Sequence, residues 1–199
     1  MAMPAHPSPP IVPEPRRYSV AEVLEFPSDG NRYEVVAGEL LVSPAPRDRH
    51  QLIILRLVLA LADYLRPLGL VELIRTAPAD ITWGAPPEDA EDLVQPDVFV
   101  IEPGQRVRDW VDVERLALAA EVSSPSTAHG DRVVKRPTYQ RHGVGTCWIV
   151  DDDAGLVEVW HPADDRPAIV TDVLTWRVNE GAPEMRLSVE ELLAPARAG

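Results

Sequence analysis

The longest apolar block of the chain is DRHQLIILRLVLALADYLR, at residues 48–66. The positions expected to be exposed are Arg49, Arg56 and Asp63, seven residues apart, with Arg66 close to the same line. This spacing predicts a helix with one narrow exposed stripe and an otherwise buried surface. Asp48 can cap its start, and Pro67 with Gly69 would end it. A helix this apolar normally packs against a sheet.

Shorter apolar runs in the rest of the chain have the length and composition of strands. They lie at residues 33–36, 39–43, 70–76, 79–83, 96–101, 116–122, 145–152, 156–162, 167–174 and 176–178. Ala37 and Gly38, between the first two runs, predict a hairpin turn. The runs at 96–101 and 116–122 are apolar without alternation, which is typical of strands buried on both faces.

Three shorter helices are predicted over residues 20–24, 132–142 and 188–193. The first and last begin with a capping box, formed by Ser19 with Glu22 and by Ser188 with Glu191. Pro137 lies inside the middle helix, so we expect a kink or a fresh start there.

The strands and helices together predict one α/β (α+β) domain over residues 18–194. Residues 1–17 contain six prolines, which remove backbone donors and fix φ, so we expect a disordered tail there. Residues 195–199 would form a second, short tail. A length of 199 residues suits one domain with tails and can bury a substantial core.

The formal net charge is −13, from 19 basic and 32 acidic residues, so the overall field repels nucleic acid. This counts against a nonspecific DNA-binding module. It counts less against a metal-dependent nuclease, whose acidic site binds cations that reverse the local field. Contact with DNA would then need a local basic patch, for which the candidates are Arg132, Lys135, Arg136 and Arg141.

Cys147 is the one cysteine, so neither an intrachain disulfide nor a zinc ribbon can form. We expect it to be a small buried hydrophobic side chain. No apolar run reaches the ~20 residues of a membrane span, and the N-terminus lacks the pattern of a signal peptide. We therefore expect a cytoplasmic protein with no membrane contact.

Two acids and one lysine carry the candidate chemistry. Asp97 opens one predicted strand, Glu121 closes another, and Lys135 lies in the helix after the following loop. Two carboxylates beside an ammonium group make a divalent-metal site with an added positive charge, which suits attack on a phosphodiester. The ordered set within one strand–loop–helix unit favours this hypothesis.

Each of these residues also has an ordinary structural interpretation. Asp97 stands where a turn or cap residue often does. Glu121 could form a structural ion pair with Arg132 or Lys135, because an ionised carboxylate in a buried strand needs a partner. Lys135 follows Asp131 by four residues, so the two could form an exposed helical pair worth about 0.3–0.5 kcal/mol.

Two weaker candidates involve other side chains. A serine hydrolase would use the hydroxyl cluster Ser123, Ser124, Ser126 and Thr127. No Gly-x-Ser-x-Gly elbow is present, however, and these hydroxyls suit helix capping and the turn at Pro125 better. His129 and His142 are not at a helical metal spacing, so we expect surface roles for both.

The motifs RYEVVAGELLVSPAP, PDVFVI, AAEVSSPST and WIVD, with His, Asp, Lys, Tyr and Gly-Val between them, resemble those of the Uma-two family of restriction-type endonucleases. The resemblance covers roughly residues 18–193, and EVSSPST and HGV…WIVD are its most specific parts. That family is assigned to the PD-(D/E)XK nuclease superfamily. The resemblance implies a restriction-endonuclease-like mixed central sheet flanked by helices.

The resemblance also implies the site residues. Asp97 is the acid of the Pro-Asp motif and Glu121 is the second acid. The usual lysine position, two residues after the second acid, is Ser123 in this chain. The resemblance places the lysine in the following helix instead, at Lys135.

Glu34 and Glu39 match acids that the family carries near its N-terminus. We expect Glu39 to join Asp97 and Glu121 in binding Mg²⁺ or Mn²⁺, with Glu34 as the second choice.

The predicted function is hydrolysis of phosphodiester bonds in DNA by a metal-dependent endonuclease. The acidic charge and the missing Glu-x-Lys spacing leave an alternative, a noncatalytic binding or regulatory protein that retains the nuclease fold. Because cutting both strands often needs two sites, a homodimer is expected too.

Overall fold

The structure is a computed structural model that describes residues 16–196. Residues 1–15 and 197–199, where tails were predicted, lie outside the described residues. Arg17, which we had assigned to the N-terminal tail, donates to the carbonyl of Ala37 in the hairpin turn. The backbone N–H of Tyr18 bonds to the carbonyl of Gly38 at 3.0 Å, so the chain is already anchored to the hairpin at this point.

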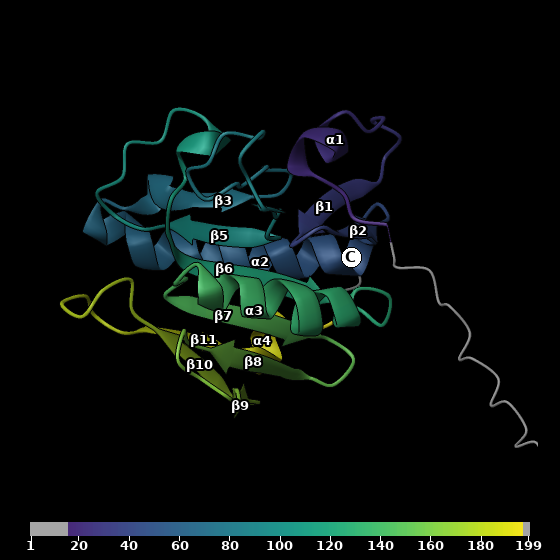
Figure 1. The fold of residues 1–199 in the computed structure, drawn as a ribbon. Helices are drawn as coiled ribbons and strands as arrows, with labels where there is room; N and C mark the ends of the chain where they lie inside the picture. The colour runs from purple at the N-terminus through teal and green to yellow at the C-terminus, as the bar shows by residue number, and fades with distance from the viewer. Residues whose placement is uncertain (1–15, 197–199) are drawn as a thin grey trace, which may run out of the picture.

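A mixed sheet of six strands forms the centre of the molecule, in the order β3-β5-β6-β7-β8-β9 (Figure 1). Its strands are β3 (Ile74–Thr76), β5 (Val98–Ile101), β6 (Leu116–Ser123), β7 (Thr146–Asp151), β8 (Leu156–Trp160) and β9 (Ala168–Val170). Only β6 and β7 run parallel, and the other neighbours are antiparallel. The expected mixed central sheet flanked by helices is therefore confirmed.

Helices cover both faces of the middle strands (Figure 1). On one face lies α2 (Asp48–Leu65), whose Leu57 packs with Leu118 and Ala120 of β6. On the other face a π-helical turn, η4 (Gly130–Lys135), continues into α3 (Arg136–Arg141). Successive side chains of a strand point to opposite faces, and both faces of β6 and β7 are covered. This is why the sequences of these two strands are apolar without alternation.

Two small sheets and several short helices complete the fold. The small sheets are β2 (Glu39–Ser43), β1 (Arg32–Val36) and β4 (Asp92–Leu93), in that order, and β10 (Val173–Trp176) with β11 (Met185–Ser188). The short helices are α1 (Val20–Leu24), η1 (Arg66–Leu68), η2 (Val71–Leu73), η3 (Trp110–Asp112) and α4 (Val189–Leu192). The predicted hairpin is confirmed: Ala37 and Gly38 have φ of 46° and 83°, as a two-residue turn between twisted strands requires. None of the helices in residues 16–196 has the length and apolar character needed to cross a bilayer.

Some expected elements differ from the structure. The run at 79–83 is not a strand; it forms a single bridge between Ile81 and Val94. Strand β11 was missed, because it has only four residues and its last, Ser188, was assigned to the terminal helix. Helix α2 is not capped by Asp48, which is its first residue, and Arg47 at the N-cap makes no side-chain capping bond.

The exposed stripe predicted for α2 is correct at Asp63 and Arg66 but wrong in the first half of the helix. Leu55 and Leu59 are 53% and 55% exposed, although we expected apolar positions to be buried. Arg56, expected in water, donates to the carbonyls of Leu192 and Ala194, which follow from α4. The C-terminal segment packs over the arginine side of α2, and so leaves the leucine side in solvent.

The helix predicted at 132–142 is confirmed, with a fresh start at Pro137. Proline has no N–H, and in a regular helix its ring clashes with the carbonyl four residues back. Here the preceding turn is widened, and the N–H of Arg136 bonds to the carbonyl of Asp131, five residues back. Pro137 then lies in the first turn of α3, where a missing N–H costs nothing.

The two faces of α2 should respond differently to truncation. Leu57 is fully buried against the sheet, so Leu57→Ala should lower the free energy of unfolding by about 2–5 kcal/mol. The matched variant Leu59→Ala, on the exposed side, should change it by less than about 0.5 kcal/mol. Urea unfolding monitored by circular dichroism would measure both, and equal effects would contradict this packing.

Candidate functional site

The two acids expected on neighbouring strands do lie beside each other. Asp97 directly precedes β5, Glu121 lies in β6, and the strands pair so that Val98 faces Ala120. The carboxylate of Asp97 accepts the backbone N–H of Val122 at 2.8 Å. Both acids are almost fully buried, at 2% and 1% exposure, so each needs compensating partners.

Lys135 lies between acids from two different elements. Its Nζ is 2.7 Å from Glu121 Oε1 and 2.8 Å from Glu34 Oε1, and the residue is 1% exposed. The exposed pair with Asp131 that helical spacing allowed is therefore not formed. The printed sequence contains no other lysine, a signal that by itself could have singled out this residue.

Glu34, rather than Glu39, joins the group. Glu34 in β1 is 1% exposed, and its Oε1 accepts the N–H of Gln95 at 2.7 Å. Glu39 pairs with Val36 beside the hairpin turn and is exposed. The structure thus brings together three of the four predicted residues, Asp97, Glu121 and Lys135, and leaves Glu39 outside.

Four further side chains belong to this cluster and were missed as site residues. Arg32 donates to Asp97 Oδ1 at 2.7 Å, and His50 Nε2 lies 3.1 Å from Asp97 Oδ2. Tyr139 donates to Glu121 Oε1, the same oxygen that faces Lys135. Asp131 is 5% exposed. Tyr139 follows Lys135 by four residues, so helical spacing could have indicated it; Arg32 and His50 depend on packing between distant segments.

The environment pushes the pKa values of the two strand acids in opposite directions. Burial would raise the pKa of Asp97, but the hydrogen bond with His50 and the charge of Arg32 hold it well below its usual value. For Glu121, burial and repulsion from Asp97 outweigh the attraction of Lys135 and raise the pKa to about 8. Burial would lower the pKa of Lys135, yet the charges of Glu121 and Glu34 hold it above its usual value.

The pKa of Asp131 is raised, as is that of Glu121. Burial raises it, and the attraction of Lys135 only partly opposes this effect. The cluster therefore contains four buried carboxyl groups, Glu34, Asp97, Glu121 and Asp131, and two cationic groups, Arg32 and Lys135, besides His50.

The cluster suits a divalent cation in charge and ligand type. Within residues 16–196, no three His, Cys, Asp or Glu side chains are arranged so that they could hold a metal together. Mg²⁺, however, is commonly held by one or two carboxylates together with substrate phosphates. Glu121 Oε2 is buried and has no partner among the described residues, so it is free to serve as such a ligand.

A small pocket leads to the cluster from the surface. Its volume is about 180 Å³, and it is lined by Glu34, Asp131, Lys135, strand β2 and the segment 126–130. That volume admits water and a phosphate-sized group. A group that entered this opening would meet Glu34, Asp131 and Lys135 first, and Asp97 and Glu121 lie outside the lining.

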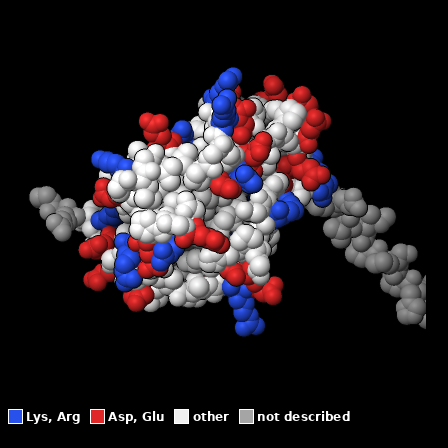
Figure 2. Space-filling view, turned by 90° about the vertical axis from the view of Figure 1, so that its left-hand side faces the viewer, with Lys and Arg blue, Asp and Glu red and all other residues white. Residues whose placement is uncertain are grey.

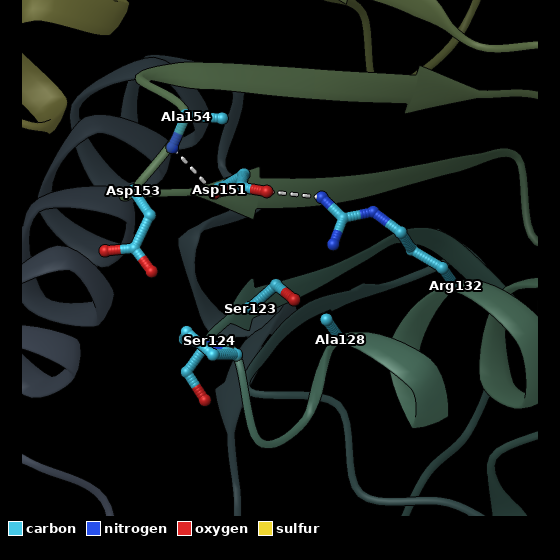
Figure 3. A pocket seen from close by; sticks show the side chains of 8 residues that line it. Ser123, Ser124, Ala128, Arg132, Asp151, Asp153 and Ala154 are labelled. Carbon is cyan, nitrogen blue, oxygen red and sulfur yellow. Dashed lines mark hydrogen bonds and ion pairs between the residues drawn. The ribbon is translucent and has the colours of Figure 1, made fainter.

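A second pocket, of about 340 Å³, lies at the ends of the parallel strands β6 and β7 (Figure 3). Ser123, which follows Glu121 by two residues, lines this pocket. Arg132 reaches across it and is already paired with Asp151 and Glu158, both at 2.6 Å. Its guanidinium is therefore not free to hold an anion.

The basic patch expected on the middle helix is largely neutralised. Besides Arg132 and the buried Lys135, Arg141 pairs with Asp92 at 2.7 Å, and Arg136 lies 4.3 Å from the ring centre of Trp160. The face in Figure 2 likewise carries acidic and basic side chains side by side, without a continuous basic area. Contact with a polyanion would have to rely on the site and its bound cations.

The mixed sheet, with one acid in β6, another directly before the adjacent β5 and a lysine from the helical segment beside them, has a restriction-endonuclease-like fold. The chain belongs to the Uma2 family, described as "Putative restriction endonuclease", whose model matches residues 20–190. It is similar in structure to a "putative nuclease belonging to DUF820" from Anabaena variabilis ATCC 29413, with a TM-score of 0.67 and 19% identity. That similarity covers 89% of this chain and 98% of the other. None of the curated proteins compared with the chain matches it. The family supports a nuclease function in general.

The raised pKa of Glu121 predicts how stability depends on pH. Between about pH 4.5, its ordinary value, and about pH 8, the folded protein keeps a proton that the unfolded chain releases. The free energy of unfolding should therefore fall as pH rises through this window, by at most about 1.4 kcal/mol per pH unit from this group. Glu121→Gln, which mimics the protonated acid, should flatten the dependence. Urea unfolding in EDTA at several pH values would measure it.

Glu88→Gln is the matched control for this measurement, because Glu88 is exposed. It should keep the slope of the unaltered protein. If Glu121→Gln and Glu88→Gln gave the same slope, Glu121 would not be the group that holds the proton.

Proposed function

We propose that this protein is a Mg²⁺- or Mn²⁺-dependent endonuclease that hydrolyses phosphodiester bonds in DNA. The observation that carries the proposal is the contact of 2.7 Å between Lys135 and Glu121, with Asp97 directly before the adjacent strand. An acid pair and a lysine from three separate elements have been brought into one buried cluster. Membership in the Uma2 family supports the same activity.

The sequence offered one argument against catalysis: Ser123 stands where the resemblance leads us to expect a lysine. The contact between Lys135 and Glu121 removes this argument. Lys135 compensates from the helix, because its long side chain reaches the same acid. A lysine ammonium is a compact point charge with three donors, which suits a gap between two carboxylate oxygens better than a planar guanidinium does.

Asp97 and Glu121 are the residues we propose to hold the cation, and Glu34, in place of Glu39, is the further acid of the site, where it pairs with Lys135. The unpartnered Oε2 of Glu121 supports this assignment. Asp97 oxygens already accept hydrogen bonds, but a carboxylate has about four acceptor positions, so they can still bind a cation. When bound, the ion would neutralise phosphate charge and lower the pKa of a water molecule.

Lys135 would act directly on the phosphate. Its raised pKa keeps it charged, so it can donate to a non-bridging oxygen and stabilise the charge that develops in the transition state. Glu34 and Glu121 orient the ammonium group from two sides. Arg32 and His50 keep the Asp97 carboxylate ionised and fixed in place.

The noncatalytic alternative retains one supporting observation, the neutralised arginines of the middle helix. A protein that binds a partner without cutting DNA would need neither a cation nor Lys135. Calorimetry with Mn²⁺ separates the two functions, because a regulatory protein of this kind should bind no Mn²⁺ at millimolar concentration. A homodimer stays a prediction, to be measured by sedimentation.

Loss of the site should abolish cleavage. Incubated with linear, supercoiled and single-stranded DNA and Mg²⁺ or Mn²⁺, the unaltered protein should cut at least one form, and EDTA should stop the reaction. Asp97→Ala and Lys135→Arg should each reduce the rate by at least about 100-fold. The second variant keeps the charge but replaces the compact ammonium with a larger planar group.

Asp165→Asn serves as the control for an acid removed elsewhere, because Asp165 is exposed. It should cut DNA at the rate of the unaltered protein. Cleavage that survived both Asp97→Ala and Lys135→Arg would assign the activity to another site.

A further inference from the structure

The oxygen atoms of the four buried carboxyl groups are not equally occupied. Glu34 Oε1 accepts the N–H of Gln95 and faces Lys135. Asp97 Oδ1 accepts from Arg32, and its Oδ2 accepts the N–H of Val122 and contacts His50. These two acids are thus held in place by the protein itself.

Glu121 is engaged on one side only. Its Oε1 receives the hydroxyl of Tyr139 and faces Lys135, whereas its Oε2 is buried with no hydrogen-bond partner among residues 16–196. Because both contacts fall on one oxygen, the carboxylate is fixed in orientation and presents the other oxygen unopposed. A buried carboxylate oxygen without a partner is costly, and a bound cation removes that cost.

Asp131 shows the same feature. It is 5% exposed, and in the described part of the chain its Oδ2 is buried with no hydrogen bond of regular geometry, although contacts of its carboxyl group with the hydroxyls of Thr127 and Ser123 lower its pKa against the effect of burial. It lines the small pocket beside Glu34 and Lys135, and its charge acts on Glu121. The widened turn η4, in which the N–H of Arg136 bonds to the carbonyl of Asp131, carries both this acid and Lys135 into the buried cluster.

We propose that Asp131 is a further metal-binding residue, which holds a hard divalent cation together with Glu121 at the inner end of this pocket. The proposal rests on the proposed metal-dependent function and adds a ligand that neither the acid pair nor the lysine indicated. Two carboxylates, with water and a substrate phosphate completing the coordination through the pocket, match the usual way in which proteins bind Mg²⁺.

A structural role and a metal-binding role for Asp131 predict opposite effects of substitution on the stability of the metal-free protein. A structural acid has partners for its oxygens, so its loss destabilises the protein whether or not metal is present. A metal-binding acid is a buried and uncompensated carboxylate when no cation is present, so it destabilises the metal-free protein. Its conversion to the neutral amide should therefore leave stability in EDTA unchanged or higher. The same conversion should remove the stabilisation that the cation provides.

Asp131→Asn and Asp92→Asn form a matched pair for this test. Asp92 is also an aspartate with 2% exposure, but its carboxylate is occupied by Ala37 N–H, Arg141 and His142. Mn²⁺ affinity would be measured by calorimetry on the full chain, and the melting temperature by thermal unfolding in EDTA and in Mn²⁺. DNA cleavage by the unaltered protein would be recorded alongside.

Asp131→Asn should weaken Mn²⁺ binding at least about tenfold, keep or raise the melting temperature in EDTA, and lose the upward shift with Mn²⁺. Asp92→Asn should melt earlier in EDTA and keep both Mn²⁺ affinity and the shift. Unchanged Mn²⁺ affinity in Asp131→Asn, with cleavage by the unaltered protein intact, would overturn the role of Asp131 alone. Absence of Mn²⁺ binding and cleavage in the unaltered protein would overturn the metal-dependent function and this inference with it.

Discussion

The contacts of the buried Lys135 ammonium group with Glu34 and Glu121 hold the parts of the site together. A fully buried ammonium group is tolerated only with close carboxylate partners. Those partners come from a peripheral hairpin and from the central sheet, so the pair connects two sheets through one side chain. The hairpin, β6 and the helical segment of Lys135 must therefore be positioned together.

Two local features keep that helical segment in place. Pro137 favours the widened turn that ends at Lys135, and it starts the regular helix behind it. At the far end of α3, Arg141 and His142 hold Asp92, which also accepts the N–H of Ala37 in the hairpin turn. Burial opposes these contacts, but they lower the pKa of Asp92 to about 2, so it stays charged. The helix is thus fastened to the hairpin outside the site as well as within it.

The cluster has more carboxyl groups than its basic side chains can balance. This excess of acid lowers the stability of the protein but suits the proposed binding of a cation. Glu121 and Asp131 both have raised pKa values because burial opposes their charge. A protein selected only for stability would replace them with neutral groups. The presence of both acids in one buried cluster, with Asp131 lining a pocket, is the physical reason to regard the site as a place for a cation.

Local periodicity and turn chemistry were enough to predict the strands beside Asp97 and around Glu121, the hairpin turn and the helix with Lys135. Which acids meet the lysine depends on packing between elements, and no local pattern predicts it. Glu34 and Glu39 lie on the same face of the hairpin, since Glu34 pairs with Leu41 and Glu39 with Val36, so alternation could not separate them. The choice depends on which end of the hairpin packs beneath η4. Contacts of Asp97 with Arg32 and His50 span 65 and 47 residues, and packing between distant elements fixes them, not local pattern.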